Sequence, residues 1–263
     1  MRRGIRSSLS ARGLLLAVGS AFLLLAACND ENTTGPDHAG TFVGQTWALG
    51  NGTARSWVTL DGAGKPTTLG ITLSEAALTN LPIESTEFSF ELPPEAGATP
   101  FRHVGLNWNP LGHQPTGVYN VPHFDVHFYM ISEAQRYAIT GTGADSLRLY
   151  RQPAPEFLPM DYINPPGTGE PRMGNHWLDA TAPELNGQPF TRTFIYGSYD
   201  GQVTFWEPMI TNAYLATQPN ATLDIKQPQR YSEAGRYYPT RYTVRFDATA
   251  LEYHITLDGF VLR

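Results

Sequence analysis

The 263-residue sequence predicts a mainly β protein, built as an antiparallel barrel or a two-sheet sandwich with one or two short helices. The composition is rich in turn formers, with 25 Gly and 21 Pro, and only 16% of the residues are charged. Such a chain favours short strands and tight turns over long surface helices. Apolar and polar residues also alternate in many short segments, which is the period of a half-buried strand. A barrel and a sandwich both protect edge strands, so the sequence leaves the two open.

Turn signals divide the chain into its expected elements. Gly50-Asn51-Gly52 separates strands expected at 41–49 and 53–60, and Asp200-Gly201 marks the turn of a hairpin over 190–210. Ser74 predicts the N-cap of a short helix over 73–81. Further strands are expected at 67–73, 86–92, 101–108, 146–150, 241–247 and 251–263. The segment 151–172 holds six prolines and no periodic pattern, so we expect it to wall a ligand pocket.

The segment 1–27 has the pattern of an export signal. Four arginines precede or begin an apolar run that is shorter than a membrane-spanning helix needs. The run ends in Leu-Ala-Ala-Cys at 25–28, which resembles the bacterial lipobox, and this resemblance implies that Cys28 is lipidated and becomes the new N-terminus. Residues 28–40 would then form a flexible tether, and residues 41–263 a single β-rich domain.

A lipid anchor implies a place at the bacterial cell envelope. Several acyl chains give a durable anchor, and Asn29 after the cysteine points to the outer membrane, facing the periplasm or the cell surface. Removing residues 1–27 removes four positive charges and no acid, so the net charge of −6 becomes −10. An acidic exported chain is a poor nucleic-acid binder. The expected partners are therefore the membrane, through Cys28, and a small-molecule ligand.

Histidines gather in the middle of the chain, where five of the seven lie between residues 103 and 176. The densest stretch, VPHFDVHFYMI at 121–131, places His123, Asp125 and His127 on one parity and apolar residues on the other. Imidazole and carboxylate groups clustered in this way are a common signature of a metal or acid–base site.

The spacing of these residues limits how they can share an ion. Residues two apart on a strand face are about 6.7 Å apart, so His123 with Asp125, or Asp125 with His127, could supply two ligands. Residues four apart, at about 13 Å, cannot share an ion on a regular strand. A helix beginning at Pro122 would instead let His123 and His127 chelate together. The alternation favours the strand.

The remaining ligands have to come from other segments. His176 follows the proline-rich segment, and Glu207 lies in an apolar strand, where a carboxylate should be paired, metal-bound or protonated. We therefore predict a divalent metal site, for zinc, manganese or iron, built from His123, Asp125, His127, His176 and Glu207. His113 is expected to cap the pocket, and Tyr129 and Trp177 to be packing residues or to form its wall.

Three stretches resemble a small bacterial family of exported domains, uncharacterised and named after a sigma-factor-regulated Thermus protein. They are NWNPLGHQPTGVYNVPHFDVHFYMI, MGNHWLD and FTRTFIYGSYDGQVTFWEPMIT, within a similar portion from about Thr41 to about Leu215. The resemblance implies a β-rich domain and no known reaction. The polar residues of the family motif, which have no established role, fall on His113, His123, Asp125, His127, His176 and Glu207.

Two functions stay open on the sequence alone. The first is an envelope-anchored metalloprotein, with or without metal-dependent enzyme activity on a small molecule. The second is a non-catalytic binding module, in which the histidines form a buried network and Trp57, Trp108 and Trp206 line a ligand surface. The chain contains no G-x-S-x-G elbow, phosphate loop or dinucleotide fingerprint. A pair of glycosidase carboxylates leaves no local signal and also stays open.

Overall fold

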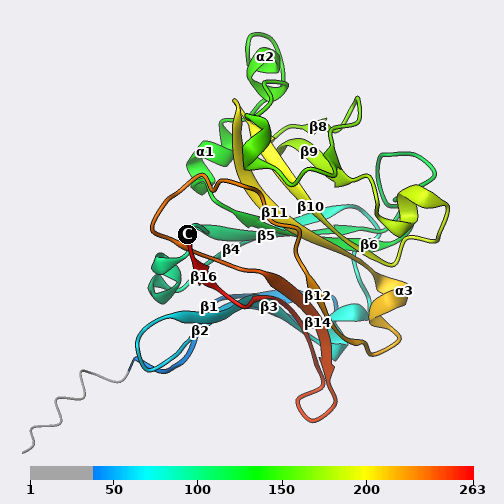
Figure 1. Ribbon diagram of the computed structural model, residues 1–263. Helices are drawn as coiled ribbons and strands as arrows, with labels where there is room; N and C mark the ends of the chain where they lie inside the picture. Colours follow the sequence, from blue (N-terminus) through cyan, green and yellow to red (C-terminus); the bar gives the residue numbers. More distant parts are fainter. Residues whose placement is uncertain (1–37) are drawn as a thin grey trace, which may run out of the picture. The chain divides into compact units, whose positions relative to one another are not determined.

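Two antiparallel sheets stacked face to face form the fold in the computed structural model, which describes residues 38–263 (Figure 1). The predicted signal peptide at 1–27, the lipidation site Cys28 and nearly all of the predicted tether lie outside the described residues. Within the described residues, no helix is long and apolar enough to cross a membrane.

The first sheet has six strands, in the order β1 (Gly40–Leu49), β2 (Gly52–Leu60), β3 (Pro66–Ser74), β15 (Glu252–Asp258), β14 (Arg241–Asp247) and β12 (Asn220–Asp224). The hairpin predicted at Gly50-Asn51-Gly52 is confirmed, because β1 and β2 pair directly across that turn. The middle of the sheet joins distant parts of the chain, since β3 pairs with β15 and Ile71 lies opposite Ile255.

The second sheet has eight strands. Its order is β4 (Thr86–Glu91), β5 (His103–Asn109), β6 (His123–Tyr129), β11 (Gln202–Thr211), β10 (Arg192–Tyr199), β9 (Gly174–Asp179) and β7 (Tyr162–Ile163), with β8 (Gly169–Glu170) paired to β9. The hairpin predicted over 190–210 is confirmed by β10 and β11. In the described part of the chain the first and last strands of each order do not pair, so the sandwich is confirmed and the closed barrel is wrong. A small third sheet pairs β13 (Tyr237–Tyr238) with β16 (Val261–Leu262).

The helices are short. They are α1 (Glu133–Tyr137), α2 (Asp145–Leu149) and α3 (Asn212–Leu215), and the 3-10 helices η1 (Glu75–Leu78), η2 (Pro94–Ala98), η3 (Pro155–Phe157) and η4 (Pro183–Asn186). The helix predicted over 73–81 is the single turn η1. Ser74 holds its N-cap position, but the hydroxyl accepts a hydrogen bond from the backbone N–H of Thr53 at 3.0 Å and makes no cap.

The strand predicted over 146–150 is wrong, because this segment lies in and directly after α2. The carboxylate of Asp145 accepts the backbone N–H groups of Thr140, at 2.8 Å, and Gly141, at 2.9 Å. These bonds fold the chain back at the start of the helix. A five-residue segment of alternating polar and apolar residues is too short for its period to separate helix from strand.

The main core lies between the two sheets and is rich in aromatic rings. Trp206 is only 1% exposed, and its ring packs 4.9 Å from that of Tyr196 and 5.7 Å from that of Tyr238. Trp108 is buried in the same core. Two of the three tryptophans expected to line a ligand surface are therefore interior packing residues, which removes most of that surface.

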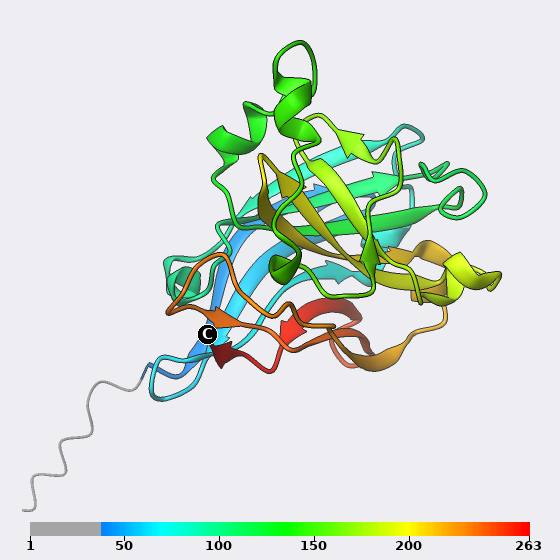
Figure 2. The ribbon, with the colours of Figure 1, turned by 45° about the horizontal axis from the view of Figure 1, so that its top comes forward.

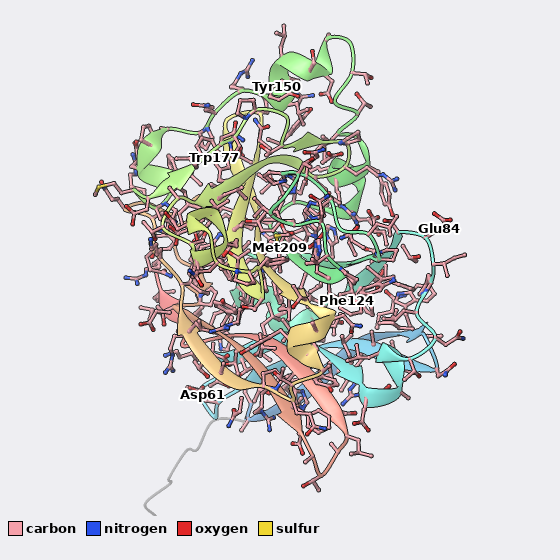
Figure 3. The ribbon with its side chains drawn as sticks, turned by 90° about the vertical axis from the view of Figure 1, so that its right-hand side faces the viewer. Asp61, Glu84, Phe124, Tyr150, Trp177 and Met209 are labelled. Carbon is pink, nitrogen blue, oxygen red and sulfur yellow. The ribbon has the colours of Figure 1, made fainter. Side chains whose placement is uncertain are left out.

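The outer face of the eight-stranded sheet carries a second, smaller apolar cluster, built from Tyr119, Leu178, Phe190, Ile195 and Met209. The β5–β6 loop supplies Tyr119 and Val118 to this cluster, and Leu185 of η4 packs against it. Figure 2 shows this loop and η4 at the same end of the sheet. Phe124 of the main core and Met209 of the outer cluster, labelled in Figure 3, belong to opposite faces of the sheet. Because both faces are covered, all seven residues of β6 are buried.

Candidate metal centre

The outward-facing residues of β6 form the base of the candidate site. His123, Asp125 and His127 alternate along the strand with Phe124 and two further core residues, Val126 and Phe128. The segment is a regular strand paired on both sides, to β5 and to β11. The strand interpretation of 121–131 is therefore confirmed, and a helix from Pro122 is wrong.

The polar side chains around β6 fall into two sets of three. The first set is His113, His123 and Asp125, and the second set is His127, His176 and Glu207. Within each set, one ligand atom from every residue lies within 4.8 Å of the others. All five residues predicted as metal ligands thus belong to one set or the other, but the structure divides them between two sets instead of the single site that was predicted. It also places His113, expected only to cap the pocket, among them.

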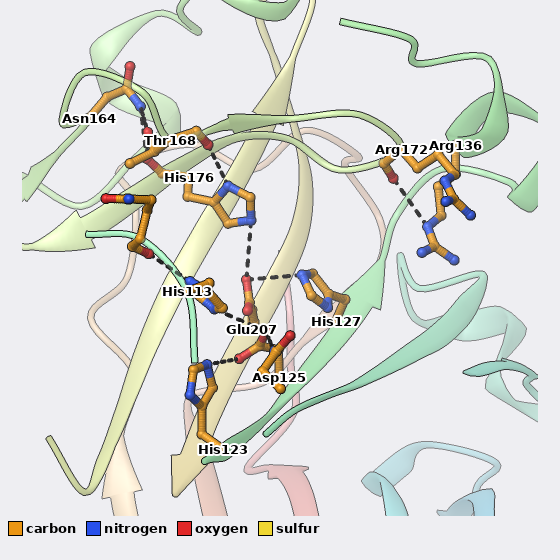
Figure 4. A network of polar contacts seen from close by, with 12 residues as sticks. His113, His123, Asp125, His127, Arg136, Asn164, Thr168, Arg172, His176 and Glu207 are labelled. Atoms are coloured by element: carbon orange, nitrogen blue, oxygen red, sulfur yellow. Dashed lines mark hydrogen bonds and ion pairs between the residues drawn. The ribbon is translucent and has the colours of Figure 1, made fainter. Parts of the chain in front are cut away.

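Asp125 is the centre of the first set (Figure 4). Its Oδ1 lies 3.1 Å from Nε2 of His123, and its Oδ2 lies 3.2 Å from Nε2 of His113. The side-chain amide of Asn109 donates to Oδ2 at 2.7 Å. Asn109 reaches the carboxylate because it lies on β5 directly opposite His123 of β6. The amide holds the carboxylate in place between the two imidazoles.

Glu207 is the centre of the second set. Its Oε2 lies 3.3 Å from Nε2 of His127 and 3.9 Å from Nε2 of His176. His127 and Glu207 are both 1% exposed, and His176 is 13% exposed. Neighbouring strands supply all three residues, since β6 and β9 flank the β10–β11 hairpin. The second set is therefore the more deeply buried of the two.

Backbone carbonyls fix the orientation of three of the histidines. Nδ1 lies 2.6 Å from a carbonyl oxygen in each case: that of Gln114 for His113, that of Val121 for His123 and that of Thr168 for His176. A carbonyl can only accept, so Nδ1 carries the hydrogen in each ring. In the neutral ring Nε2 is then an acceptor aimed at a carboxylate. Metal-binding histidines are oriented by the same second-nitrogen bond.

Several buried atoms of the two sets lack a hydrogen-bond partner among residues 38–263. They are Nε2 of His123, Oδ1 of Asp125, both ring nitrogens of His127 and Oε2 of Glu207. An unsatisfied buried polar atom costs about 1–3 kcal/mol, and native proteins hold few of them. Nε2 of His123 faces Oδ1 of Asp125, and Nε2 of His127 faces Oε2 of Glu207. Such an arrangement is stable only when a proton or a cation lies between the atoms.

The surroundings shift the pKa values of the Asp125 and Glu207 carboxyl groups in opposite directions. Burial alone would raise the pKa of Asp125, but the charge of His123 and the hydrogen bonds of the first set outweigh it and lower that pKa. Burial and the negative charge of Asp125 raise the pKa of Glu207 well above its usual value. Burial lowers the pKa of His176 to about 4 and that of His127 well below 6.5. At pH 7 both rings of the second set are therefore neutral, as metal ligation requires.

A cavity of about 230 Å³ opens onto both sets. His113 and Asp125 of the first set and His176 of the second set line it. Residues of the proline-rich segment also line it, namely Gly167, Thr168, Glu170 and Pro171. The expectation that 151–172 walls a pocket is thus met by its last residues, which lie around β8.

Tyr129 and Trp177 do not line this cavity. Tyr129 is fully buried, and its ring is stacked 4.7 Å from that of His103 and 5.3 Å from that of His127. Trp177 follows His176 on β9, points to the opposite face and packs in the main core. Tyr129 therefore packs against the ring of His127 and helps to hold it in place, while Trp177 stabilises the sandwich.

Sequence reasoning missed the residues that hold the ligands. Asn107 and Asn109 line the cavity, and Thr168 orients His176 through its carbonyl. One signal was present, because Asn107 and Asn109 alternate with Leu106 and Trp108 in the same way as the polar residues of β6. Every residue has a backbone carbonyl, so nothing in the sequence indicated that Thr168 would orient His176.

Fold and site together define an antiparallel β-sandwich with a candidate His/Asp/Glu metal centre on the outer face of one sheet. A model of the TTHB210-like family, described as hypothetical protein TTHB210, matches residues 61–108. This match agrees with the resemblance to an uncharacterised family named after a Thermus protein. It covers β3, β4 and most of β5, whereas the three motif stretches lie outside it apart from residues 107–108. No curated protein and no solved structure matches the chain significantly.

Proposed function

We propose that the protein binds a divalent transition metal, zinc, manganese or iron, and presents it to a small molecule in the adjoining cavity. One observation carries this proposal: in both sets, imidazole Nε2 atoms point at carboxylate oxygens 3.1–3.9 Å away. Ligand atoms of a metal with bonds of about 2.1 Å lie about 3.0–3.4 Å apart. A cation between them satisfies several of the unpaired acceptors at once.

The donor set narrows the choice of metal. Imidazole suits zinc and iron, carboxylate suits manganese, and a mixture of the two admits all three. Each set offers three side-chain ligands, which is fewer than the four to six positions that these ions fill. The remaining positions would face the cavity. A metal held in this way acts as a Lewis acid and activates water, so hydrolysis of a small molecule is the favoured activity.

Metal analysis of the protein, purified without a histidine tag, tests this proposal. We expect bound zinc, manganese or iron, and we expect zinc added after chelation to raise the midpoint of thermal unfolding, because an ion that binds only the folded state stabilises it. His176→Gln should reduce the shift. The matched control is His254→Gln, since His254 lies on β15 and contacts Thr72 outside both sets.

The outcome also decides between the two functions left open by the sequence. Protein that stays metal-free after incubation with all three metals would exclude a metal centre. The cluster would then be a buried network held by protons, with Asp125 ionised beside its histidines and Glu207 protonated.

We also propose that lipid on Cys28 anchors the domain at the outer membrane, with the cavity exposed to the periplasm or the cell surface. Cells that express the full chain should incorporate labelled palmitate into the protein, and Cys28→Ser should abolish the label. Cys28 is the only cysteine, so no other thiol can take its place. Equal labelling of both proteins, or of neither, would contradict the anchor.

A further inference from the structure

We infer that the centre holds two divalent ions, one in each three-ligand set, and that a small oxyanion in the cavity bridges them. The inference rests on the proposed metal binding and concerns its stoichiometry and its ligand class. Three features of the described residues support it: the composition of the sets, their separation and their access to the cavity. The charge of two bound ions then indicates the ligand class.

The two sets have the same composition. Each consists of two histidines and one carboxylate: His113, His123 and Asp125 in the first, and His127, His176 and Glu207 in the second. Two imidazoles and one carboxylate are a complete set for a divalent metal with open positions. Neither set needs a residue from the other, so each can hold an ion by itself.

The separation of the sets opposes one shared ion. The six residues form two groups of three rather than a single group of six. In Figure 4 His113 and His123 approach Asp125, whereas His127 and His176 approach Glu207. The sets are nevertheless neighbours.

The sheet keeps the two sets side by side. Asp125 and His127 are separated by one residue of β6. Glu207 lies on β11 between Trp206, which pairs with Phe128, and Met209, which pairs with Asp125. Two ions held here would therefore lie on one sheet face, within reach of a single small ligand.

The charge of two ions calls for an anionic ligand. Both carboxylates are buried, and the charge of Asp125 acts on Glu207. The two carboxylates could neutralise one divalent ion, whereas two ions would carry positive charge that these carboxylates do not cancel. Two ions of charge +2 and two carboxylates leave a net charge of +2, or +1 with Glu170 of the cavity wall included.

This residual charge identifies the ligand class. The cavity touches both sets and has no Lys or Arg among the residues that line it. An anion entering it would be recognised by the ions themselves. A small oxyanion with two oxygens to share, such as a phosphate group, fits this role, because paired metals clamp oxygens of a reacting group.

The number of bound ions tests the inference. Apoprotein equilibrated with zinc and separated from free metal is expected to retain two zinc ions per chain. Asp125→Asn and Glu207→Gln are each expected to retain one, and the double variant none. The matched control is Glu184→Gln, a buried carboxyl outside both sets, which should retain two. The substitutions are close in shape to the native residues, and circular dichroism checks that each variant folds.

Two readouts keep the test decisive if a carboxyl variant fails to fold. His123→Gln and His127→Gln each remove one ligand from a different set. In the unmodified protein loaded with manganese, two adjacent ions broaden the six-line electron paramagnetic resonance signal that one isolated ion gives. A single zinc ion, lost in both single variants, would overturn the two-ion inference and leave metal binding intact. No retained zinc in any form would overturn both.

Inorganic phosphate is the probe for the ligand class. By calorimetry, the two-zinc protein is expected to bind phosphate at least about tenfold more tightly than either single-set variant, since only the former can bridge two ions. Equal affinities in all three forms would overturn the bridging oxyanion.

Discussion

Replacing Gly197 by alanine is expected to destabilise the fold by about 3 kcal/mol and to weaken metal binding by about 10–100-fold. Gly197 lies on β10 opposite Phe205 of β11, and a methyl group there would sit 1.9 Å from Cε1 of the Phe205 ring. That ring is fully buried and cannot turn away into solvent. It packs 4.9 Å from the ring of His127 and 5.2 Å from the ring of His176. The missing side chain of Gly197 thus makes the space that lets Phe205 position two histidines of the second set.

Urea unfolding and zinc competition measure the two effects of Gly197→Ala. The matched control is Gly97→Ala, because no atom lies within 4 Å of the added carbon and the backbone there is unstrained. We expect this control to change stability by less than about 0.5 kcal/mol. Native stability together with native zinc affinity in Gly197→Ala would show that Phe205 does not hold the site.

The hairpins were predictable because the residues that specify each turn lie next to the strands that pair. The turns at Gly50-Asn51-Gly52 and Asp200-Gly201 lie between strands that pair directly, so pattern and structure involve the same residues. The choice of sandwich over barrel depends on distant pairings, such as Ile71 with Ile255. No local period records which strand will be the neighbour of another, and that choice therefore stayed open.

For the candidate site, too, local patterns in the sequence identified the residues but not their arrangement. Alternation placed His123, Asp125 and His127 on one face, and an apolar setting singled out Glu207. The division into two sets was not visible, because it depends on the β5–β6 loop that brings Nε2 of His113 to 3.2 Å from Asp125. Loop paths follow from tertiary contacts and leave no period in the sequence.

Acid is expected to destabilise the metal-free protein through His103, and His103→Phe should remove that part of the effect. His103 lies on β5, is only 4% exposed and is stacked on Tyr129. Burial, followed by the positive charge of Arg136, lowers its pKa to about 4, although Glu133 acts in the opposite direction. In the unfolded chain the pKa returns to about 6.5.

The sign of the effect follows from proton binding. Between pH 6.5 and pH 4 the unfolded chain binds a proton at His103 that the folded chain does not, so stability falls as the pH falls. The stabilisation is fully present above pH 6.5 and is lost towards pH 4, where the difference reaches about 3 kcal/mol. Phenylalanine keeps a ring against Tyr129 and cannot titrate.

Urea unfolding of both proteins in chelator, from pH 7 to pH 4, separates His103 from the other groups. Buried His176, with a pKa of about 4, makes both proteins less stable in acid, so the difference between the two curves isolates His103. The free energy of unfolding of the native protein should fall by about 3 kcal/mol more than that of His103→Phe. Parallel curves would mean that His103 takes up its proton in the folded state at an ordinary pH, and hence that Arg136 and burial beside Tyr129 do not keep the ring neutral.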